Sequence, residues 1–311
     1  MIKANQKKGV WSAAPTPLTR DGRVDERSVG RMIEHHLRLG VRGLFLAGTN
    51  GEGPWLPERD LRSLVRSAVG QNRGRLAIAV QVTANSAAQI LENSEKAAED
   101  GADMAVIAPP FFAAGYAAEK DRADRISRIY LEAIRKNPLP VGIYDRGSFS
   151  SVAIPDRVLE RIYGENNVII VKDSSCSDAR MALALKVKHS RPGLSLLDGY
   201  EFDCVRYLKA GYDGLLLGGG VFNGFIARRI WEAAMAQDYP RAERLQKKMN
   251  RIMYAVYGGK KIRTWLSGEK YLLVKMGIFG TWRNHPDYPL TAADRLRIES
   301  VLEKESDWLL P

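Results

Sequence analysis

Two residues of the sequence, Tyr144 and Lys172, are suited to Schiff-base chemistry. Lys172 follows four apolar residues, 168–171, that predict a strand buried on both faces. A buried ammonium is costly, so this lysine reaches solvent, pairs with a neighbour such as Asp173, or serves as a neutral nucleophile. Tyr144 lies 28 residues earlier, and a phenol beside the amine can transfer protons while an imine forms. The alternative for Tyr144 is a structural hydroxyl bonded to the backbone.

The elements that must position this pair alternate along the chain. Eight short apolar segments predict strands at residues 10–14, 43–47, 76–82, 104–108, 140–144, 168–171, 194–197 and 214–217. Helical patterns lie between them, at residues 25–39, 57–69, 86–98, 123–136, 155–162, 178–188 and 201–209. Such alternation implies parallel strands with right-handed crossovers, and eight units predict a (β/α)8 TIM barrel. An open doubly wound sheet is disfavoured because no glycine-rich phosphate turn follows the first strand.

The last part of the chain is predicted to be helical throughout. Its four helical segments are residues 225–236, 240–257, 262–276 and 291–304. We therefore divide the chain into a barrel, residues 1–224, and a C-terminal helical extension, residues 225–311. The first of the four helices would close the barrel, and the other three would form a small bundle.

The active site of such a barrel lies at the C-terminal ends of the strands. With one βα repeat between them, Tyr144 and Lys172 are predicted at the same height on adjacent strands. After the second strand, Thr49, Asn50 and Gly51 offer a hydroxyl, an amide and backbone N–H groups at a turn into a helix, which suits a carboxylate. The alternative is a tight turn that only caps the helix. Gly218, after the eighth strand, would let a ligand approach the backbone.

Composition excludes several other classes of function. The formal charge of +11 is spread over the helical segments and forms no basic block with interleaved aromatics, so no nucleic-acid partner is expected. No apolar run approaches the roughly 20 residues of a membrane span. Only two cysteines occur and nothing resembles a signal peptide, so a reducing cytoplasm is the expected compartment. Both cysteines, Cys176 and Cys204, are expected to be buried. The four histidines have no metal-ligand spacing.

Taken together, these motifs resemble a known family over nearly the whole chain. The chain is similar to the dihydrodipicolinate synthase and N-acetylneuraminate lyase family of Schiff-base aldolases. The ordered set of motifs, about one per strand, is specific, although no single motif is. The motifs are Pro15-Thr16-Pro17, Gly48-Thr49-Asn50-Gly51-Glu52, Gly101-Ala102-Asp103, Pro109-Pro110, Ile143-Tyr144, Val171-Lys172-Asp173, Asp198-Gly199, Gly211-Tyr212-Asp213-Gly214, Lys275-Met276-Gly277-Ile278 and Pro289-Leu290.

The resemblance implies a barrel with C-terminal helices that forms a homo-oligomer, a tetramer or a dimer. It implies that Lys172 forms a Schiff base with pyruvate or another 2-keto acid, and that Tyr144 transfers protons. Thr49 and Asn50 would hold the substrate carboxylate. No cofactor is implied, because the iminium itself accepts the electrons.

Some positions depart from the synthase pattern. Where the synthase has a Pro-Tyr-Tyr motif with a proton-relaying second tyrosine, this chain has Pro110-Phe111-Phe112. The synthase also has an arginine five residues after the tyrosine that corresponds to Tyr144, and this chain has Phe149 at that position. Arg146 is available instead for a distal substrate group, and Tyr144-Asp145-Arg146 resembles the Tyr-Asn-Arg of keto-deoxyglucarate dehydratases.

Three functions remain open on the sequence. The first is a Schiff-base lyase, an aldolase or a dehydratase, acting on pyruvate or a 2-keto acid such as a 2-keto-3-deoxy sugar acid. The second is dihydrodipicolinate synthase, which condenses pyruvate with aspartate semialdehyde. The third is a barrel that binds a keto acid without catalysis. The walls expected to select the substrate are formed by Phe112, Arg146, Phe149, Tyr200 and Phe222.

Overall fold

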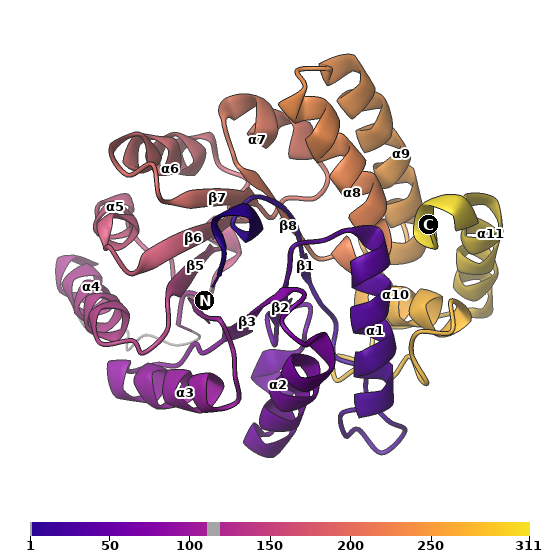
Figure 1. Ribbon diagram of the computed structural model, residues 1–311, viewed down its shortest axis with the longest axis horizontal. Coiled ribbons are helices and arrows are strands. Elements are labelled where there is room, and N and C mark those ends of the chain that lie inside the picture. Colours follow the sequence, from indigo (N-terminus) through magenta and orange to yellow (C-terminus); the bar gives the residue numbers. More distant parts are fainter. Residues whose placement is uncertain (1, 111–118) are drawn as a thin grey trace.

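The computed structural model describes residues 2–110 and 119–311, and eight parallel strands form a closed barrel in it (Figure 1). Each strand pairs with its neighbours in sequence, and the eighth pairs with the first. This confirms the predicted TIM barrel with C-terminal helices. The strands are β1 (Gly9–Ala13), β2 (Gly43–Leu46), β3 (Ala77–Gln81), β4 (Met104–Ile107), β5 (Val141–Asp145), β6 (Val168–Asp173), β7 (Ser195–Asp198) and β8 (Gly214–Leu217).

The helices of the βα units surround the strands (Figure 1). The last of them begins directly after β8, at Gly220, and not at Phe225 as predicted. Its first turn is buried, which explains why amphipathic periodicity does not mark it. The helices are α1 (Glu26–Leu39), α2 (Glu58–Asn72), α3 (Ala87–Glu99), α4 (Glu119–Arg135), α5 (Asp156–Gly164), α6 (Asp178–Ser190), α7 (Cys204–Ala210) and α8 (Gly220–Met235).

The strands bury both of their faces, in two separate hydrophobic clusters. The larger cluster lies between strands and helices and includes Val171. The smaller one fills the barrel interior and includes Trp11, Phe45 and Tyr144. Because strand side chains alternate between faces, Tyr144 and Lys172 lie on the interior face at the top of this column.

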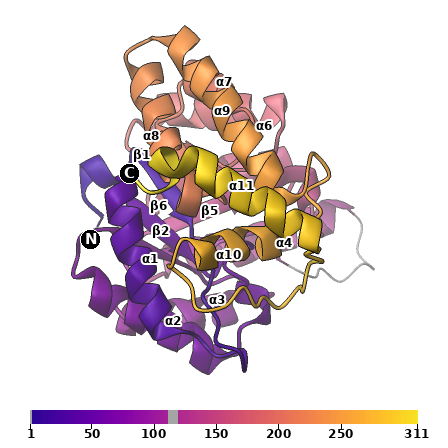
Figure 2. The same cartoon turned by 90° about the vertical axis from the view of Figure 1, so that its right-hand side faces the viewer.

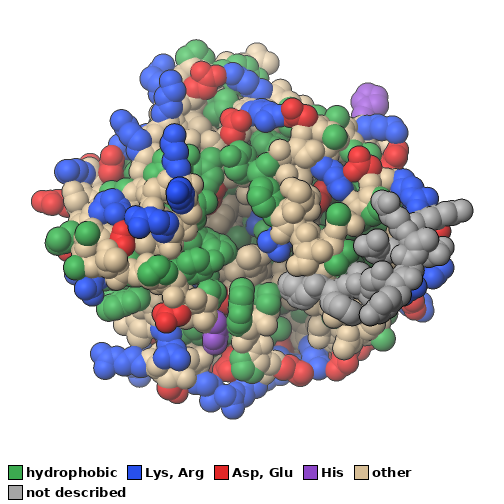
Figure 3. Space-filling model, turned by 180° about the vertical axis from the view of Figure 1, so that it is seen from behind, with side chains coloured by type: hydrophobic (Ala, Val, Ile, Leu, Met, Phe, Trp, Pro, Cys, Tyr) green, Lys and Arg blue, Asp and Glu red, His purple; other side chains and the backbone are tan. Residues whose placement is uncertain are grey.

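The N-terminal segment lies across the opposite end of the barrel (Figure 1). This segment contains a short 3-10 helix, Ala4–Gln6. The indole N–H of Trp11 donates a hydrogen bond of 2.7 Å to the Gln6 carbonyl in it. Ile2 packs against the interior cluster. Figure 3, from the opposite side, shows a central hollow bordered by hydrophobic side chains. The interior is therefore accessible at the C-terminal ends of the strands.

Three further helices follow α8 and pack against one another (Figure 2). They are α9 (Tyr239–Tyr257), α10 (Trp265–Lys275) and α11 (Ala292–Leu309). Helix α10 is buried over most of its length, including the charged Glu269 and Lys270. No helix in the described part of the chain is long and apolar enough to cross a membrane.

Candidate active site

Tyr144 and Lys172 are direct partners in the pairing of β5 with β6, as their spacing predicts. Both side chains are buried, with exposed fractions of 7% and 6%. The Lys172 nitrogen lies 4.2 Å from the centroid of the Tyr144 ring and 5.3 Å from that of Phe45. The amine therefore lies against two aromatic rings at the end of the barrel interior.

A glycine makes room for the lysine. A Cβ on Gly199, after β7, would lie 2.9 Å from the Lys172 Cε and 2.1 Å from the Ser174 Oγ. Real Cβ atoms do not approach other atoms so closely, so any larger residue would displace the lysine. The sequence motif contains Gly199, but the reason for it is visible only in the structure.

Strands β5, β6 and β7 each end in an aspartate, one residue after a side chain that faces the barrel interior. Each aspartate points outward and shapes the loop that follows. Asp145, Asp173 and Asp198 are paired in register across β5, β6 and β7. Each accepts a hydrogen bond from the N–H two residues later, an Asx turn. The Asp173 carboxylate also accepts a hydrogen bond of 2.6 Å from the Tyr212 hydroxyl. It therefore has a structural role on the strand face opposite to Lys172. The three turn bonds are Gly147 N to Asp145 at 2.9 Å, Ser175 N to Asp173 at 2.9 Å and Tyr200 N to Asp198 at 2.7 Å.

Opposing effects act on the pKa of Tyr144. Burial raises it, but the positive charges of Lys172 and Arg146 lower it, and Thr49 acts in the same direction through its hydroxyl. The net result is a pKa below the ordinary value of 10.0. A larger share of Tyr144 is therefore phenolate near neutral pH than for a free tyrosine, which suits a group that must both take up and release protons.

In the loop after β2, the Asn50 side chain is bonded to the protein itself. The Asn50 amide nitrogen donates to the Ala13 carbonyl at 2.9 Å, to the Gly218 carbonyl at 3.2 Å and to Glu269 at 3.0 Å. These bonds occupy the amide donors. Within the described residues, the backbone N–H groups of Thr49 and Asn50 have no hydrogen-bond acceptor. The carboxylate-binding role of this loop stays a prediction, and it now depends on Thr49 and on backbone N–H groups.

Close packing fixes the shape of the loop. A Cβ on Gly51 would lie 2.7 Å from the Ala47 nitrogen and 2.9 Å from the Ala14 carbonyl oxygen, so only glycine fits there. The Thr16 hydroxyl donates to the Gly51 carbonyl at 2.6 Å. Gly51 is thus placed by the fold, and its contribution to substrate binding would be indirect.

A buried ion pair joins the loop to the C-terminal helices. Glu52, in the left-handed region at φ 58°, is fully buried and pairs with the fully buried Lys270 of α10. The other Glu52 oxygen accepts from the His285 N–H at 2.6 Å, and Lys270 donates to the Arg283 carbonyl at 2.8 Å. The C-terminal extension therefore fixes the active-site loop and is not a separate appendage.

The strand ends enclose a pocket of about 330 Å³. Lys172, Tyr144, Thr49, Asn50, Arg146 and Gly218 line it together, as predicted, and Phe149 and Tyr200 also contribute walls. Sequence reasoning missed Glu201 as a wall and missed every wall from the C-terminal extension. The missed residues are Glu201, Phe202, Tyr257, Ile262 and Trp265. The charged pair Glu269-Lys270 within the apolar stretch 265–273 was the available signal that this helix faces something polar.

The structure places two residues differently from what the sequence predicts. Phe222 is fully buried and packs against the ring of Tyr257 at a centroid distance of 5.8 Å, behind the pocket wall. Cys176 lines the pocket and is exposed, not buried as expected, whereas Cys204 is buried. Partial desolvation of its sulfur at the pocket wall raises the pKa of Cys176 to about 11, so the thiol form predominates near neutral pH. Phe112 lies outside the described residues.

In the described ranges 2–110 and 119–311, no group of three His, Cys, Asp or Glu residues is arranged to hold a metal ion. The adjacent His35 and His36 are buried in α1 and bonded to the Val221 and Met32 carbonyls, each at 2.8 Å. The pocket residues therefore offer the chemistry of an amine, Lys172, of a phenol, Tyr144, and of carboxyl groups.

Comparison with known proteins agrees with this geometry. The profile of the Dihydrodipicolinate synthetase family matches residues 6–305. The chain belongs to this family. It is 26% identical to the 4-hydroxy-tetrahydrodipicolinate synthase of Xylella fastidiosa over 209 residues, 67% of this chain and 66% of that enzyme. It is 23% identical to the N-acetylneuraminate lyase of Rhizobium meliloti over 301 residues, 96% of each chain.

A solved structure supports the same assignment. The dihydrodipicolinate synthase of Bacteroides thetaiotaomicron superimposes with a TM-score of 0.85 at 26% identity, covering 96% of this chain and 98% of that one. The chain is accordingly a lyase of the dihydrodipicolinate synthetase family. The relatives include two different activities at similar identity, so the choice of substrate must be argued from the pocket.

Proposed function

We propose that this lyase acts on a 2-keto acid through an imine at Lys172. The observation that carries the proposal is the direct pairing of Lys172 with Tyr144 at the base of the pocket. An amine among aromatic rings is a suitable nucleophile for a ketone, and a phenol beside it can remove and return the protons of carbinolamine formation and dehydration.

The rest of the pocket fits a keto acid whose carboxylate lies at the β2 loop. Thr49 and the free N–H groups of the loop supply donors for that carboxylate. With the keto carbon at the Lys172 nitrogen, the remainder of the substrate would extend toward the walls formed by Arg146, Tyr200 and Glu201. These polar walls favour a hydroxylated chain, such as that of a 2-keto-3-deoxy sugar acid.

Dihydrodipicolinate synthase activity is the less favoured alternative. Phe149 occupies the position at which the synthase pattern has an arginine, and its side chain is 62% exposed at the pocket edge. A phenyl ring cannot neutralise the distal carboxylate of a dicarboxylic adduct. A keto-acid-binding barrel without catalysis is disfavoured by the intact pair of Tyr144 and Lys172.

Reductive trapping tests the proposal directly. The protein is incubated with pyruvate, or with a 2-keto-3-deoxy sugar acid, and reduced with borohydride, and the modified peptide is identified by mass spectrometry. We expect a secondary amine at Lys172 and none in Lys172→Ala, with Lys186→Ala as a matched control on the exposed face of α6. Absence of trapping, or trapping that persists in Lys172→Ala, would contradict the proposal.

A panel of substrates separates the candidate activities. Pyruvate release from sugar acids indicates aldol cleavage, loss of water indicates dehydration, and consumption of aspartate semialdehyde with pyruvate indicates the synthase. We also propose a homo-oligomer, either a tetramer or a dimer, which sedimentation velocity would test. A monomer at micromolar concentration would contradict that part.

A further inference from the structure

A second group of ionisable side chains lies on the far wall of the same pocket. Glu201, after β7, and Tyr257, at the end of α9, line the pocket, and Glu269 of α10 is fully buried behind them. The Tyr257 hydroxyl lies close to both carboxyls, without a well-aligned hydrogen bond to either. Tyr257 is only 1% exposed. The Tyr257 hydroxyl is thus placed to interact with either carboxyl of this wall.

The geometry orients Glu201 toward the pocket. Its Oε2 accepts from the Gly219 N–H at 2.6 Å, at the start of α8. Its Oε1 lies over Gly218, at 3.5 Å from the position that a Cβ on that glycine would take. Because Oε2 already accepts an N–H, we assign the proton of a neutral Glu201 to Oε1.

Burial favours the neutral form of the carboxyl groups on this wall. Burial raises the pKa of Glu201, although the Gly219 N–H, the Tyr257 hydroxyl and Lys172 oppose the shift. Burial also raises the pKa of Glu269 well above its ordinary value, against the Asn50 amide bond, and the charge of Glu201 adds to the rise. Lys270 is committed to Glu52, so it cannot neutralise both carboxyls of the wall. Burial of both carboxyls therefore favours their protonated forms.

We propose that Glu201 is the proton donor to a leaving hydroxyl group, with Tyr257 and Glu269 as its positioning residues, and that the enzyme is a dehydratase. The inference rests on the proposed imine at Lys172 and deepens it. A retro-aldol cleavage needs a base to remove a hydroxyl proton, whereas a dehydration needs an acid to protonate the departing oxygen. Glu201, a buried carboxyl on the pocket wall with one oxygen bonded to the Gly219 N–H, is placed to supply the second of these.

The step balances with the groups present. The substrate keto carbon, C2, is an iminium with Lys172, and the Tyr144 phenolate removes a proton from C3 to give an enamine. The C2–C3 π electrons then form a C3–C4 double bond, the nitrogen lone pair restores the iminium, and the C4–O bond breaks with its electrons on oxygen. Glu201 protonates that oxygen, so water leaves. Hydrolysis of the iminium frees the product, and the proton on Tyr144 returns to Glu201 through solvent.

A leaving-group experiment on Glu201→Gln tests the proton transfer. The probes are the 2-keto-3-deoxy sugar acid that the wild-type enzyme dehydrates fastest and its analogue with chloride in place of the leaving hydroxyl. We expect kcat on the hydroxyl substrate to fall by about 10²–10⁴-fold. Chloride leaves without a proton, so the variant should process the chloro analogue within about threefold of the wild-type rate. Glu34→Gln, an exposed carboxyl on α1, is the matched control.

The pH profile of Tyr257→Phe tests the positioning role. The Tyr257 hydroxyl lowers the pKa of Glu201, so its removal should keep Glu201 protonated to higher pH and move the descending limb of kcat upward. An unmoved limb would contradict this role.

Three results would overturn the proton-donor proposal. They are a small effect of Glu201→Gln on the hydroxyl substrate, an equal loss on both substrates, and pyruvate release as the only wild-type reaction. Trapping at Lys172 is scored separately in every variant, so failure of the imine itself is distinguished from failure of the proton donor.

Discussion

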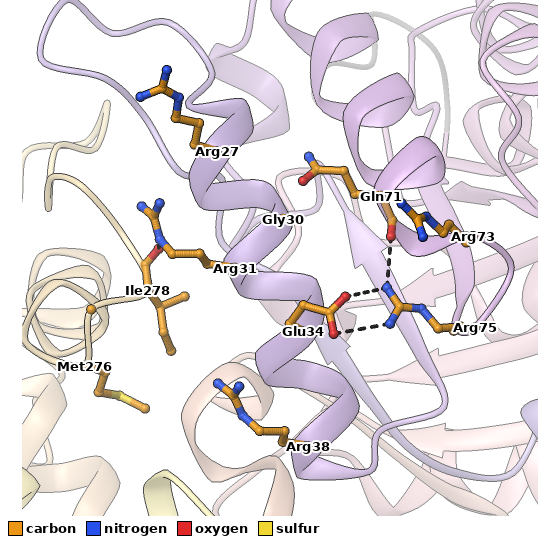
Figure 4. Close-up of a pocket in the computed structure, with 11 residues that line it drawn as sticks. Arg27, Gly30, Arg31, Glu34, Arg38, Gln71, Arg73, Arg75, Met276 and Ile278 are labelled. Carbon is orange, nitrogen blue, oxygen red and sulfur yellow. Dashed lines mark hydrogen bonds and ion pairs between the residues drawn. The ribbon is translucent and has the colours of Figure 1, made fainter.

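A groove on the outside of the barrel and the pocket at the strand ends differ in kind, and the larger of these two is the less suited to chemistry. A groove of about 790 Å³ lies between α1, α2 and residues 276–278, and arginines surround it (Figure 4). The pocket at the strand ends has less than half that volume. In the groove the charges are exposed: Arg75 pairs with Glu34, and Arg31 donates to the Ile278 carbonyl at 2.8 Å. The arginines of the groove are Arg27, Arg31, Arg38, Arg73 and Arg75.

The difference lies in what water can reach. Exposed charges are screened by water and salt, so their pairs contribute little. In the pocket, burial raises the pKa of Glu201, nearby positive charges lower the pKa of Tyr144, and buried polar atoms such as the Asn50 Oδ1 have no hydrogen-bond partner among the described residues. A small enclosed volume with perturbed groups is the place where binding and proton transfer are coupled, so the buried pocket is the better candidate site.

The largest expected difference between the two regions is in stability. Lys270→Met leaves Glu52 as an unpaired buried charge, so we expect the free energy of unfolding to fall by about 3–5 kcal/mol, measured by urea denaturation. Arg75→Met in the groove breaks the exposed pair with Glu34, and its midpoint should not change measurably. Equal effects of the two substitutions would remove the distinction between the regions.

The next effect is on activity. Tyr144→Phe should lower kcat by about 10²–10³-fold, because no phenol remains to transfer protons. The pKa of Tyr144 lies below 10.0, so wild-type activity should rise with pH along a limb below pH 10 that reports its ionisation. That limb should be lost in the variant, as steady-state kinetics across pH would show. Tyr271→Phe, outside the pocket, is the control; an unchanged limb in Tyr144→Phe would assign it to another group.

A smaller effect is expected from crowding the lysine. Gly199→Ala places a methyl group against Lys172 and Ser174, so we expect kcat to fall by about 10²-fold through misplacement of the amine. Gly70→Ala in α2, where a Cβ meets nothing within 4 Å, is the control for a helix-favouring change near the groove. The two variants are compared by kinetics and by thermal melting. Normal kcat in Gly199→Ala would show that the loops adjust freely.

The smallest effect concerns the groove itself. Replacing both Arg38 and Arg73 with alanine should leave kcat/KM unchanged and should only lower the salt concentration at which the protein elutes from heparin. Activity that falls with these arginines would mean that the groove and the pocket are coupled.

Local sequence was enough to predict the barrel and its central pair. Each strand is a short apolar run and each helix an amphipathic one, and a constant repeat length places Tyr144 beside Lys172 without further information. Helix α8 begins five residues earlier than predicted, because its first turn is buried on all sides and its sequence shows no amphipathic periodicity.

Contacts between distant segments were not predictable in the same way. Asn50 was expected to face the substrate, but its amide binds Glu269, which is 219 residues away. Tyr257 and Trp265 reach the pocket only because the C-terminal helices fold back over the strand ends. Sequence periodicity shows that a helix has a buried face but not what covers that face. The sequence therefore determined which groups can do the chemistry, whereas tertiary packing decided their partners and their burial, and with them the direction in which each pKa shifts.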